Sequence, residues 1–161
     1  MASGVKVDNE VVEMAQAFNN GSARDKYAFL TVRIADDKKS IIWDEKESVT
    51  KIDAGMLTTK PVPDELAEEE ENKRYAAFRN QLNAEVPRWY MYDCFRVIGP
   101  SRRKKDQVIW VHWCPDTGHV KQKMLYAASK DAFKKAVDAK IMIECSDFDD
   151  IDHDRLLSIL K

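Results

Sequence analysis

The segment that most constrains the fold runs from residue 107 to residue 143. Gln107 to Trp113 is nearly continuous in apolar side chains, which is typical of a strand buried on both faces of a sheet. A helical pattern follows over Val120–Lys135, and Ile141–Ile143 is a second, short apolar run. A strand, a long helix and another strand form a crossover, so the two strands should run parallel through a right-handed connection.

The N-terminal half adds a helix, a hairpin and a second helix. Asp8 is suited to cap a first helix that ends at Gly21. Alternating apolar residues predict a hairpin of strands Tyr27–Ile34 and Ser40–Trp43, and helical spacing returns over Asp64–Asn83.

A third strand, Arg88–Val97, and a last helix, about Asp150–Leu160, complete the pattern. The sequence therefore predicts an α/β fold of the α+β type, with a central mixed five-stranded sheet and helices on both faces. At 161 residues the chain is expected to be a single domain over 1–161. Residues 1–6 are expected to be a flexible N-terminus, and 53–73 an insertion.

Composition excludes several classes of function. The chain has 44% hydrophobic and 34% charged residues, yet its formal net charge is only −2, so the molecule as a whole attracts neither nucleic acid nor lipid. We find no apolar run of membrane-spanning length and no signal-peptide core, and therefore expect a soluble protein of the cytoplasm. Three cysteines without framework spacing fit reduced thiols.

The long helix over Val120–Lys135 has an unusual exposed face. At 100° per residue, Met124 lies between Lys121 and Lys123, so an apolar tip is flanked by two ammonium groups. Such a face suits a groove with acidic rims and an apolar floor. Ser129 could act as a fresh N-cap, which predicts a break or kink near Ala128.

The second helix begins with an acidic run, Glu68 to Glu71. Glu69 with Lys73 and Glu70 with Arg74 are oppositely charged pairs four residues apart. We interpret the run as the solvated first half of a helix rather than as an interaction tail.

Two metal sites and a catalytic thiol are weaker hypotheses. His112, Cys114 and His119 fall within eight residues, but no fourth zinc ligand and no orienting carboxylate accompany them. The aspartates between Asp147 and Asp154 lack the glycine and the closing glutamate of a calcium loop, and they more simply cap the last helix. We therefore expect no metal, no cofactor and no enzymatic activity.

The string Lys123–Lys130 closely resembles the long helix of the actin-depolymerising factor/cofilin family. Tyr90–Asp93, Trp113–Asp116 and the opening Met1–Val5 match the same family in the same chain order. The resemblance covers nearly the whole chain and implies the actin-depolymerising-factor-homology fold. It also implies a monomeric, cytoskeletal protein that binds actin monomers and filament sides and promotes severing, depolymerisation and filament turnover.

The resemblance further implies residue roles. Six residues match positions that contact the actin monomer in this family: Ser3, Gly4, Val5, Lys121, Lys123 and Met124. Ser3 also matches a regulatory serine, where a phosphate adds negative charge and repels an acidic actin surface.

A second surface, which touches a neighbouring filament subunit in the family, corresponds to five residues here: Arg102, Arg103, Lys104, Lys105 and Asp106. The sequence predicts a hairpin tip with four consecutive cations and a strong local field. These cations also suit phosphoinositide headgroups, which compete with actin in this family.

Some features depart from the family pattern. The family's second surface also uses charged residues of the last helix, where this chain has Leu157–Leu160 and stops at Lys161, so we expect weakened filament-side contact. The insertion at 53–73 is longer than expected. A coactosin-like or maturation-factor-like member, which binds filaments or the branch-nucleating complex without severing, is therefore the alternative. A phosphoinositide-binding module and an enzyme using Cys114 and His119 are more distant ones.

Overall fold

The computed structural model describes residues 5–20, 26–56, 64–98 and 103–158. Its elements follow in this order: β1 (Lys6–Val7), α1 (Asn9–Asn19), β2 (Tyr27–Ile34), β3 (Ser40–Trp43), β4 (Val49–Thr50), α2 (Asp64–Gln81), β5 (Arg88–Ile98), β6 (Arg103–Trp113), α3 (Val120–Ala136), β7 (Met142–Cys145), a 3-10 helix η1 (Phe148–Asp150) and α4 (His153–Ser158).

The strands form one mixed sheet in the order β1-β3-β2-β5-β6-β7, with β4 pairing β2. The predicted crossover is confirmed, because β6 and β7 are parallel with Trp110 opposite Met142. The sheet has seven strands rather than the predicted five. The two additions, β1 and β4, are only two residues long and so show no periodicity in the sequence.

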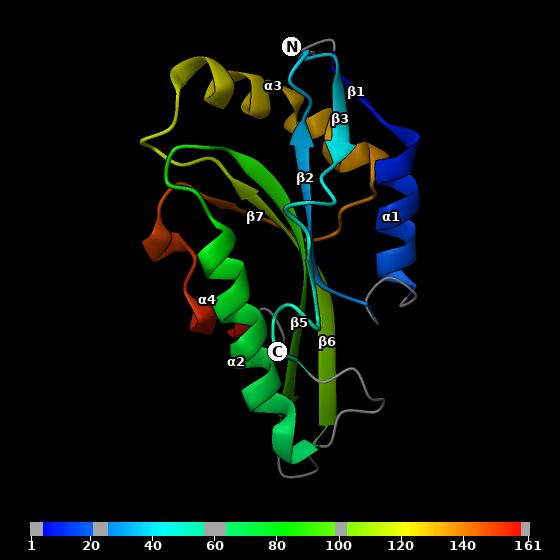
Figure 1. The fold of residues 1–161 in the computed structure, drawn as a ribbon, viewed down its shortest axis with the longest axis vertical. Helices are drawn as coiled ribbons and strands as arrows, with labels where there is room; N and C mark the ends of the chain where they lie inside the picture. The colour runs from blue at the N-terminus through cyan, green and yellow to red at the C-terminus, as the bar shows by residue number, and fades with distance from the viewer. Residues whose placement is uncertain (1–4, 21–25, 57–63, 99–102, 159–161) are drawn as a thin grey trace.

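Helices cover both faces of the sheet, as predicted (Figure 1). Alternate residues of the strands point to opposite faces, so β2 gives Leu30 to one core and Phe29 to the other. The first core lies under α1 and α3 and includes Phe18 and Phe133. The second lies under α2 and α4 and includes Phe78.

The first helix and hairpin are confirmed. Asp8 caps α1, its carboxylate accepting from the Glu10 N–H, and Asn20 is the C-terminal cap. The predicted end at Gly21 lies outside the described residues. Strands β2 and β3 are antiparallel, with Val32 opposite Trp43.

The predicted basic hairpin tip is shorter than expected. β5 and β6 pair continuously as far as Ile98 opposite Arg103, so residues 103–106 belong to a strand and not to a loop. Arg102 lies outside the described residues. The strands are longer than predicted because cross-strand hydrogen bonding continues past the apolar run that marks the strand in the sequence.

The predicted solvated start of α2 is wrong for two of its four glutamates. Glu70 is 5% exposed and Glu71 is 3% exposed. The Lys73 ammonium lies 3.1 Å from Glu70, and Arg74 lies 3.4 Å from Glu71. These ion pairs, with a hydrogen bond from the Tyr92 hydroxyl to Glu71, make the burial of carboxylates tolerable.

The aspartates before α4 act as caps. The Asp147 carboxylate accepts from the Asp150 N–H at 3.0 Å at the start of η1. Asp150 in turn accepts from the Ser146 N–H at 2.9 Å. Within the described residues, no group of three or more metal-ligating side chains lies close enough to hold an ion.

Candidate functional site

The most exposed apolar side chains of α3 lie in its first turns. Val120 is 67% exposed and Met124 is 66% exposed, and Lys121 beside them is also exposed. The helical spacing of Lys121 and Met124 is therefore realised on the surface, as the sequence predicts. Val120, four residues before Met124, enlarges the apolar tip; it was not predicted, although i,i+4 spacing puts the two residues on one face of a helix.

Lys123 is held differently from Lys121. It is only partly exposed, and its ammonium donates to the Asp116 carbonyl at 3.2 Å. This bond ties the first turn of α3 to the turn that precedes it. One cation of the predicted pair is thus fixed by the fold, whereas Lys121 projects into solvent.

The turn before α3 is itself fixed to the α2–β5 loop. Trp113 Nε1 donates to the Asn83 carbonyl at 2.8 Å, and the Thr117 hydroxyl donates to the Ala84 carbonyl. Gly118 permits a close approach, because an added Cβ would lie 3.1 Å from the Glu85 carbonyl oxygen. A larger residue there would push the start of α3 outward.

Aromatic side chains bind the inner face of α3 to the sheet. The Phe133 ring stacks on Trp89 with centroids 4.5 Å apart and meets Trp110 edge-on at 5.1 Å. Tyr126 lies 4.7 Å from Trp89, and its hydroxyl oxygen accepts from the Ile34 N–H at 3.0 Å. These contacts fix the rotation of the helix, and therefore fix which residues face solvent.

The predicted N-cap at Ser129 is wrong. α3 is one helix from Val120 to Ala136, and Ser129 is 1% exposed inside it. Its hydroxyl donates to the Leu125 carbonyl at 2.8 Å, one turn earlier. A serine that bonds back in this way satisfies its own hydroxyl and stays in a helix interior, so the helix continues.

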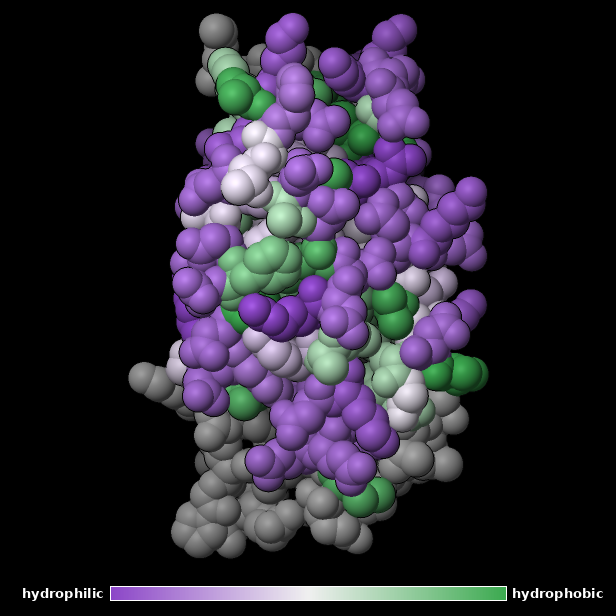
Figure 2. All heavy atoms as spheres, turned by 60° about the vertical axis from the view of Figure 1, so that its left-hand side comes forward, coloured by the Kyte–Doolittle hydropathy of each residue, from purple (hydrophilic) through white to green (hydrophobic). Residues whose placement is uncertain are grey.

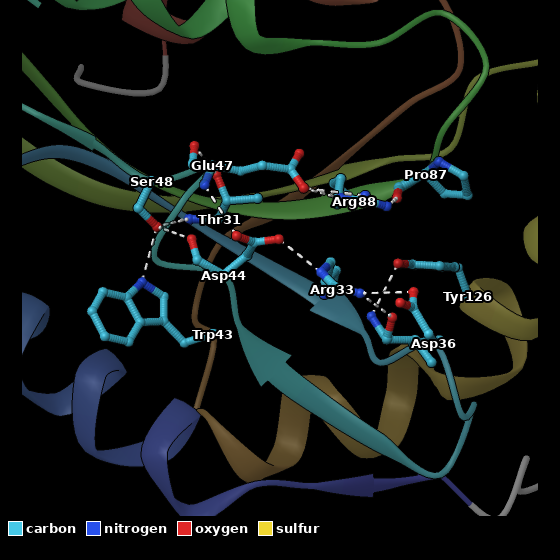
Figure 3. A network of polar contacts seen from close by, with 11 residues as sticks. Thr31, Arg33, Asp36, Trp43, Asp44, Glu47, Ser48, Pro87, Arg88 and Tyr126 are labelled. Carbon is cyan, nitrogen blue, oxygen red and sulfur yellow. Dashed lines mark hydrogen bonds and ion pairs between the residues drawn. The ribbon is translucent and has the colours of Figure 1, made fainter. Parts of the chain in front are cut away.

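A polar network packs where Tyr126 meets the end of β2 (Figure 3). Arg33 Nε donates to Asp44 at 2.7 Å, and Arg88 donates to Glu47 at 3.2 Å. Burial raises the pKa of Asp44, but hydrogen bonds from Glu47 and Arg33 outweigh it and hold the pKa below its usual value. The segment between β3 and β4 is thereby fixed against β2 and β5.

The N-terminal residues are only partly within the described chain. Ser3 and Gly4 lie outside it, and Val5 is 8% exposed in the core under α1 and α3. Lys6, at the end of the segment expected to be flexible, lies in β1 and pairs with Ser40 of β3, and β1 contacts α3. The described start of the chain therefore lies next to α3.

The backbone of the second predicted surface forms part of a strand. Arg103, Lys104, Lys105 and Asp106 form the first part of β6, far from α3 along the strand (Figure 1). The structure does not bring them together with Lys121 and Met124. The two predicted surfaces are separate regions of the molecule.

The three residues of the predicted thiol and histidine cluster lie in different surroundings: His112 is buried, Cys114 is half-buried and His119 is exposed. Trp89 Nε1 donates to His112 Nδ1 at 2.7 Å, and burial, followed by the charge of Lys130, lowers the pKa of His112 to about 4. Burial raises the pKa of the Cys114 thiol, and it raises that of Cys145 to about 12. Neither thiol is suited to act as a nucleophile near neutral pH.

The side of the molecule that carries α2 and α4 is mainly hydrophilic, with small separate hydrophobic patches (Figure 2). In the described part of the chain, no helix has the length and apolar character needed to cross a membrane. The first turns of α3 are the best candidate for a binding surface because Val120 and Met124 are among the most exposed large apolar side chains of the described residues.

Comparisons with known proteins agree with this fold. A cofilin from Streptomyces griseoflavus has 24% identity and a TM-score of 0.71, with 98% of each chain covered. The ADF-like protein UNC-60A of Caenorhabditis elegans has 24% identity and a TM-score of 0.74, covering 98% of this chain and 94% of that one. Human coactosin-like protein has 16% identity and a TM-score of 0.64, covering 100% and 91%.

The family itself is shown by sequence. The model for cofilin/tropomyosin-type actin-binding proteins matches residues 4–161, which is nearly the whole chain. This family is non-enzymatic, so the prediction of a binding protein is confirmed. The chain belongs to the cofilin/ADF family of actin-binding proteins.

Proposed function

We propose that this chain binds actin monomers and filament sides, and that it promotes filament severing and subunit loss in the cytoplasm. The observation that carries the proposal is the exposed tip of α3, where Val120 and Met124 stand in solvent beside Lys121. An apolar tip flanked by cations is complementary to an apolar gap with acidic rims. Preferential binding to one filament geometry shifts the filament toward that geometry.

Ser3, Gly4 and Val5 complete the proposed monomer surface, and phosphorylation of Ser3 would weaken binding by repulsion. The cations of β6 would reach a neighbouring subunit, and they would also bind phosphoinositide headgroups in competition with actin. Pelleting with anionic vesicles, with and without actin, ranks these two ligands.

The test is actin co-sedimentation of Lys121→Ala combined with Lys123→Ala. We expect binding to be lost, because the double substitution removes both the exposed Lys121 ammonium and the Lys123 ammonium that is held by the Asp116 carbonyl. The matched control is Lys134→Ala with Lys135→Ala, which removes two exposed charges from the last turn of the same helix. Circular dichroism checks that both variants fold. Equal binding by the two double variants would remove the first turns of α3 from the site.

A separate measurement tests severing. Filament lengths followed by fluorescence microscopy should shorten when the protein is added. Binding without shortening would favour a coactosin-like member. Failure to pellet with filaments would favour a maturation-factor-like member, which binds the branch-nucleating complex.

A further inference from the structure

The start of α3 lacks the usual supports of a helix terminus. The described residues show no side-chain hydrogen bond from His119, the N-cap residue, and the first turn contains no acidic residue. Such groups normally pair the free N–H groups and balance the positive end of a helix. Packing does not hold this turn either, because Val120 and Lys121 are exposed and the first buried residue of the helix is Tyr126. The position of the turn therefore depends on contacts from other segments.

The α2–β5 loop supplies these contacts. Trp113 Nε1 donates to the Asn83 carbonyl at 2.8 Å, and the Thr117 hydroxyl donates to the Ala84 carbonyl. The loop is a firm support, because the Glu85 N–H donates to the Asn83 side chain at 2.8 Å and the Trp113 ring is fully buried. The bond from Thr117 lies in the exposed turn directly before α3, so it is the one that acts closest to the helix.

Lys123 extends this support from the turn into the helix. Its ammonium donates to the Asp116 carbonyl at 3.2 Å, and its Cγ would lie 3.5 Å from a Cβ added at Gly118. The side chain is thus folded back over the turn. Lys121, in the same turn of the helix, is exposed. The two lysines therefore differ in what they can do for a binding surface.

We propose that Thr117 and Lys123 are positioning residues, which hold the first turn of α3 in the orientation that presents the apolar tip to a partner. Lys121 contacts the partner directly, whereas Lys123 acts through the turn. Without these bonds the turn adopts further orientations, and the apparent affinity falls with the fraction of molecules in the competent one. That the partner is actin rests on the proposed function, whereas the support of the helix start does not.

Hydrogen exchange of the free protein, followed amide by amide by nuclear magnetic resonance, tests the support without any partner. The Lys123 N–H donates to the His119 carbonyl at 3.0 Å, so it exchanges when the first turn opens. Thr117→Val should speed this exchange about fivefold, which corresponds to the loss of one hydrogen bond. The Ser129 N–H, deeper in α3, should exchange as in the wild type. Thr117→Ser, which keeps the hydroxyl, should restore the wild-type rate.

The matched control is Thr50→Val, which removes a hydroxyl of the same kind from another turn. Thr50 Oγ1 accepts from the Asp53 N–H at 3.1 Å in the turn after β4. This variant should leave the exchange rate of the Lys123 N–H unchanged. An unchanged rate in Thr117→Val would overturn the role of Thr117. Equal acceleration by Thr50→Val would overturn it as well, because a general loss of stability would then explain the effect.

A second pair of variants separates support from contact. Lys123→Met keeps the methylene stem over Gly118 but removes the ammonium, and Lys121→Met makes the same change at the exposed lysine. Lys123→Met should speed exchange of the Met124 N–H severalfold, and Lys121→Met should leave it unchanged. Equal rates in the two variants would overturn the positioning role of Lys123.

Pelleting with actin filaments then connects the support to binding. Thr117→Val should weaken binding severalfold and Thr117→Ser should not, whereas Lys121→Met should weaken binding without any change in exchange. Faster exchange together with wild-type binding in Thr117→Val would contradict the link between the support and the tip. Failure of the wild-type chain to bind actin would instead contradict the proposed function, and the exchange rates would still decide whether Thr117 and Lys123 hold the helix.

Discussion

On one face of the sheet α3 is attached by stacked rings, whereas on the other face the middle of α2 is attached by buried charge. Phe133 packs between Trp89 and Trp110. Glu71 and Arg74, in contrast, are 3% and 5% exposed and bond to each other and to β5. Apolar packing stabilises the attachment of a helix without exact geometry, but a buried ion pair stabilises it only when both partners are in place. The attachment of α3 to the sheet is therefore the more robust of the two.

The largest expected effect tests the apolar attachment. Phe133→Ala should lower the free energy of unfolding by about 4 kcal/mol, because it removes a fully buried ring and leaves a cavity between two tryptophans. Urea denaturation measures the change. Phe148→Ala is the control, since that ring is only partly buried and should cost clearly less. Similar losses for the two would mean that Phe133 does not anchor α3.

The next effect tests the charged attachment. Arg74→Met should cost about 3 kcal/mol, because it removes one partner of a buried ion pair while the Glu71 carboxylate stays buried. Adding Glu71→Leu should recover most of that loss, since two apolar side chains then replace two charges. The same denaturation experiment measures both variants. A double variant as unstable as Arg74→Met alone would contradict this account of α2.

The smallest effect concerns a buried polar group on the α3 face. Burial lowers the pKa of His112 from its ordinary 6.5 to about 4. Between these two pH values the unfolded chain binds a proton that the folded chain does not. The free energy of unfolding therefore keeps its full value above pH 6.5 and decreases as the pH falls below it. The loss due to His112 should be about 2 kcal/mol between about pH 7 and about pH 5.

His112→Asn should flatten this part of the pH profile of the unfolding free energy. The slope should not vanish, because burial also lowers the pKa of His153. His119→Asn, at an exposed histidine before α3, is the control and should leave the slope unchanged. A slope unaffected by His112→Asn would show that this ring is not the group that resists protonation.

Much of the fold could be predicted from the sequence because its elements have clear periods. β2 and β3 have their predicted bounds, and the crossover through α3 follows from chain order. β1 was missed because two residues carry no period. The extension of β6 back to Arg103 was missed because pairing with β5, and not side-chain pattern, creates that strand.

The surface position of the candidate residues, though not their role, was predictable to the same degree. Lys121 and Met124 are surface residues because helical spacing alone separates them from Tyr126. The tie of Lys123 to the Asp116 carbonyl and the interior position of Ser129 depend on contacts from other segments. No local pattern contains such contacts, so the sequence could not distinguish the two lysines or place the serine.

The hydrogen bond between Tyr126 and Ile34 joins residues 92 positions apart in the chain. Because β2 lies inside the sheet and β7 at its edge, this bond connects α3 to an interior strand as well as to the edge strand that follows it. A pull on the outer side of α3 is therefore distributed to two distant strands at once.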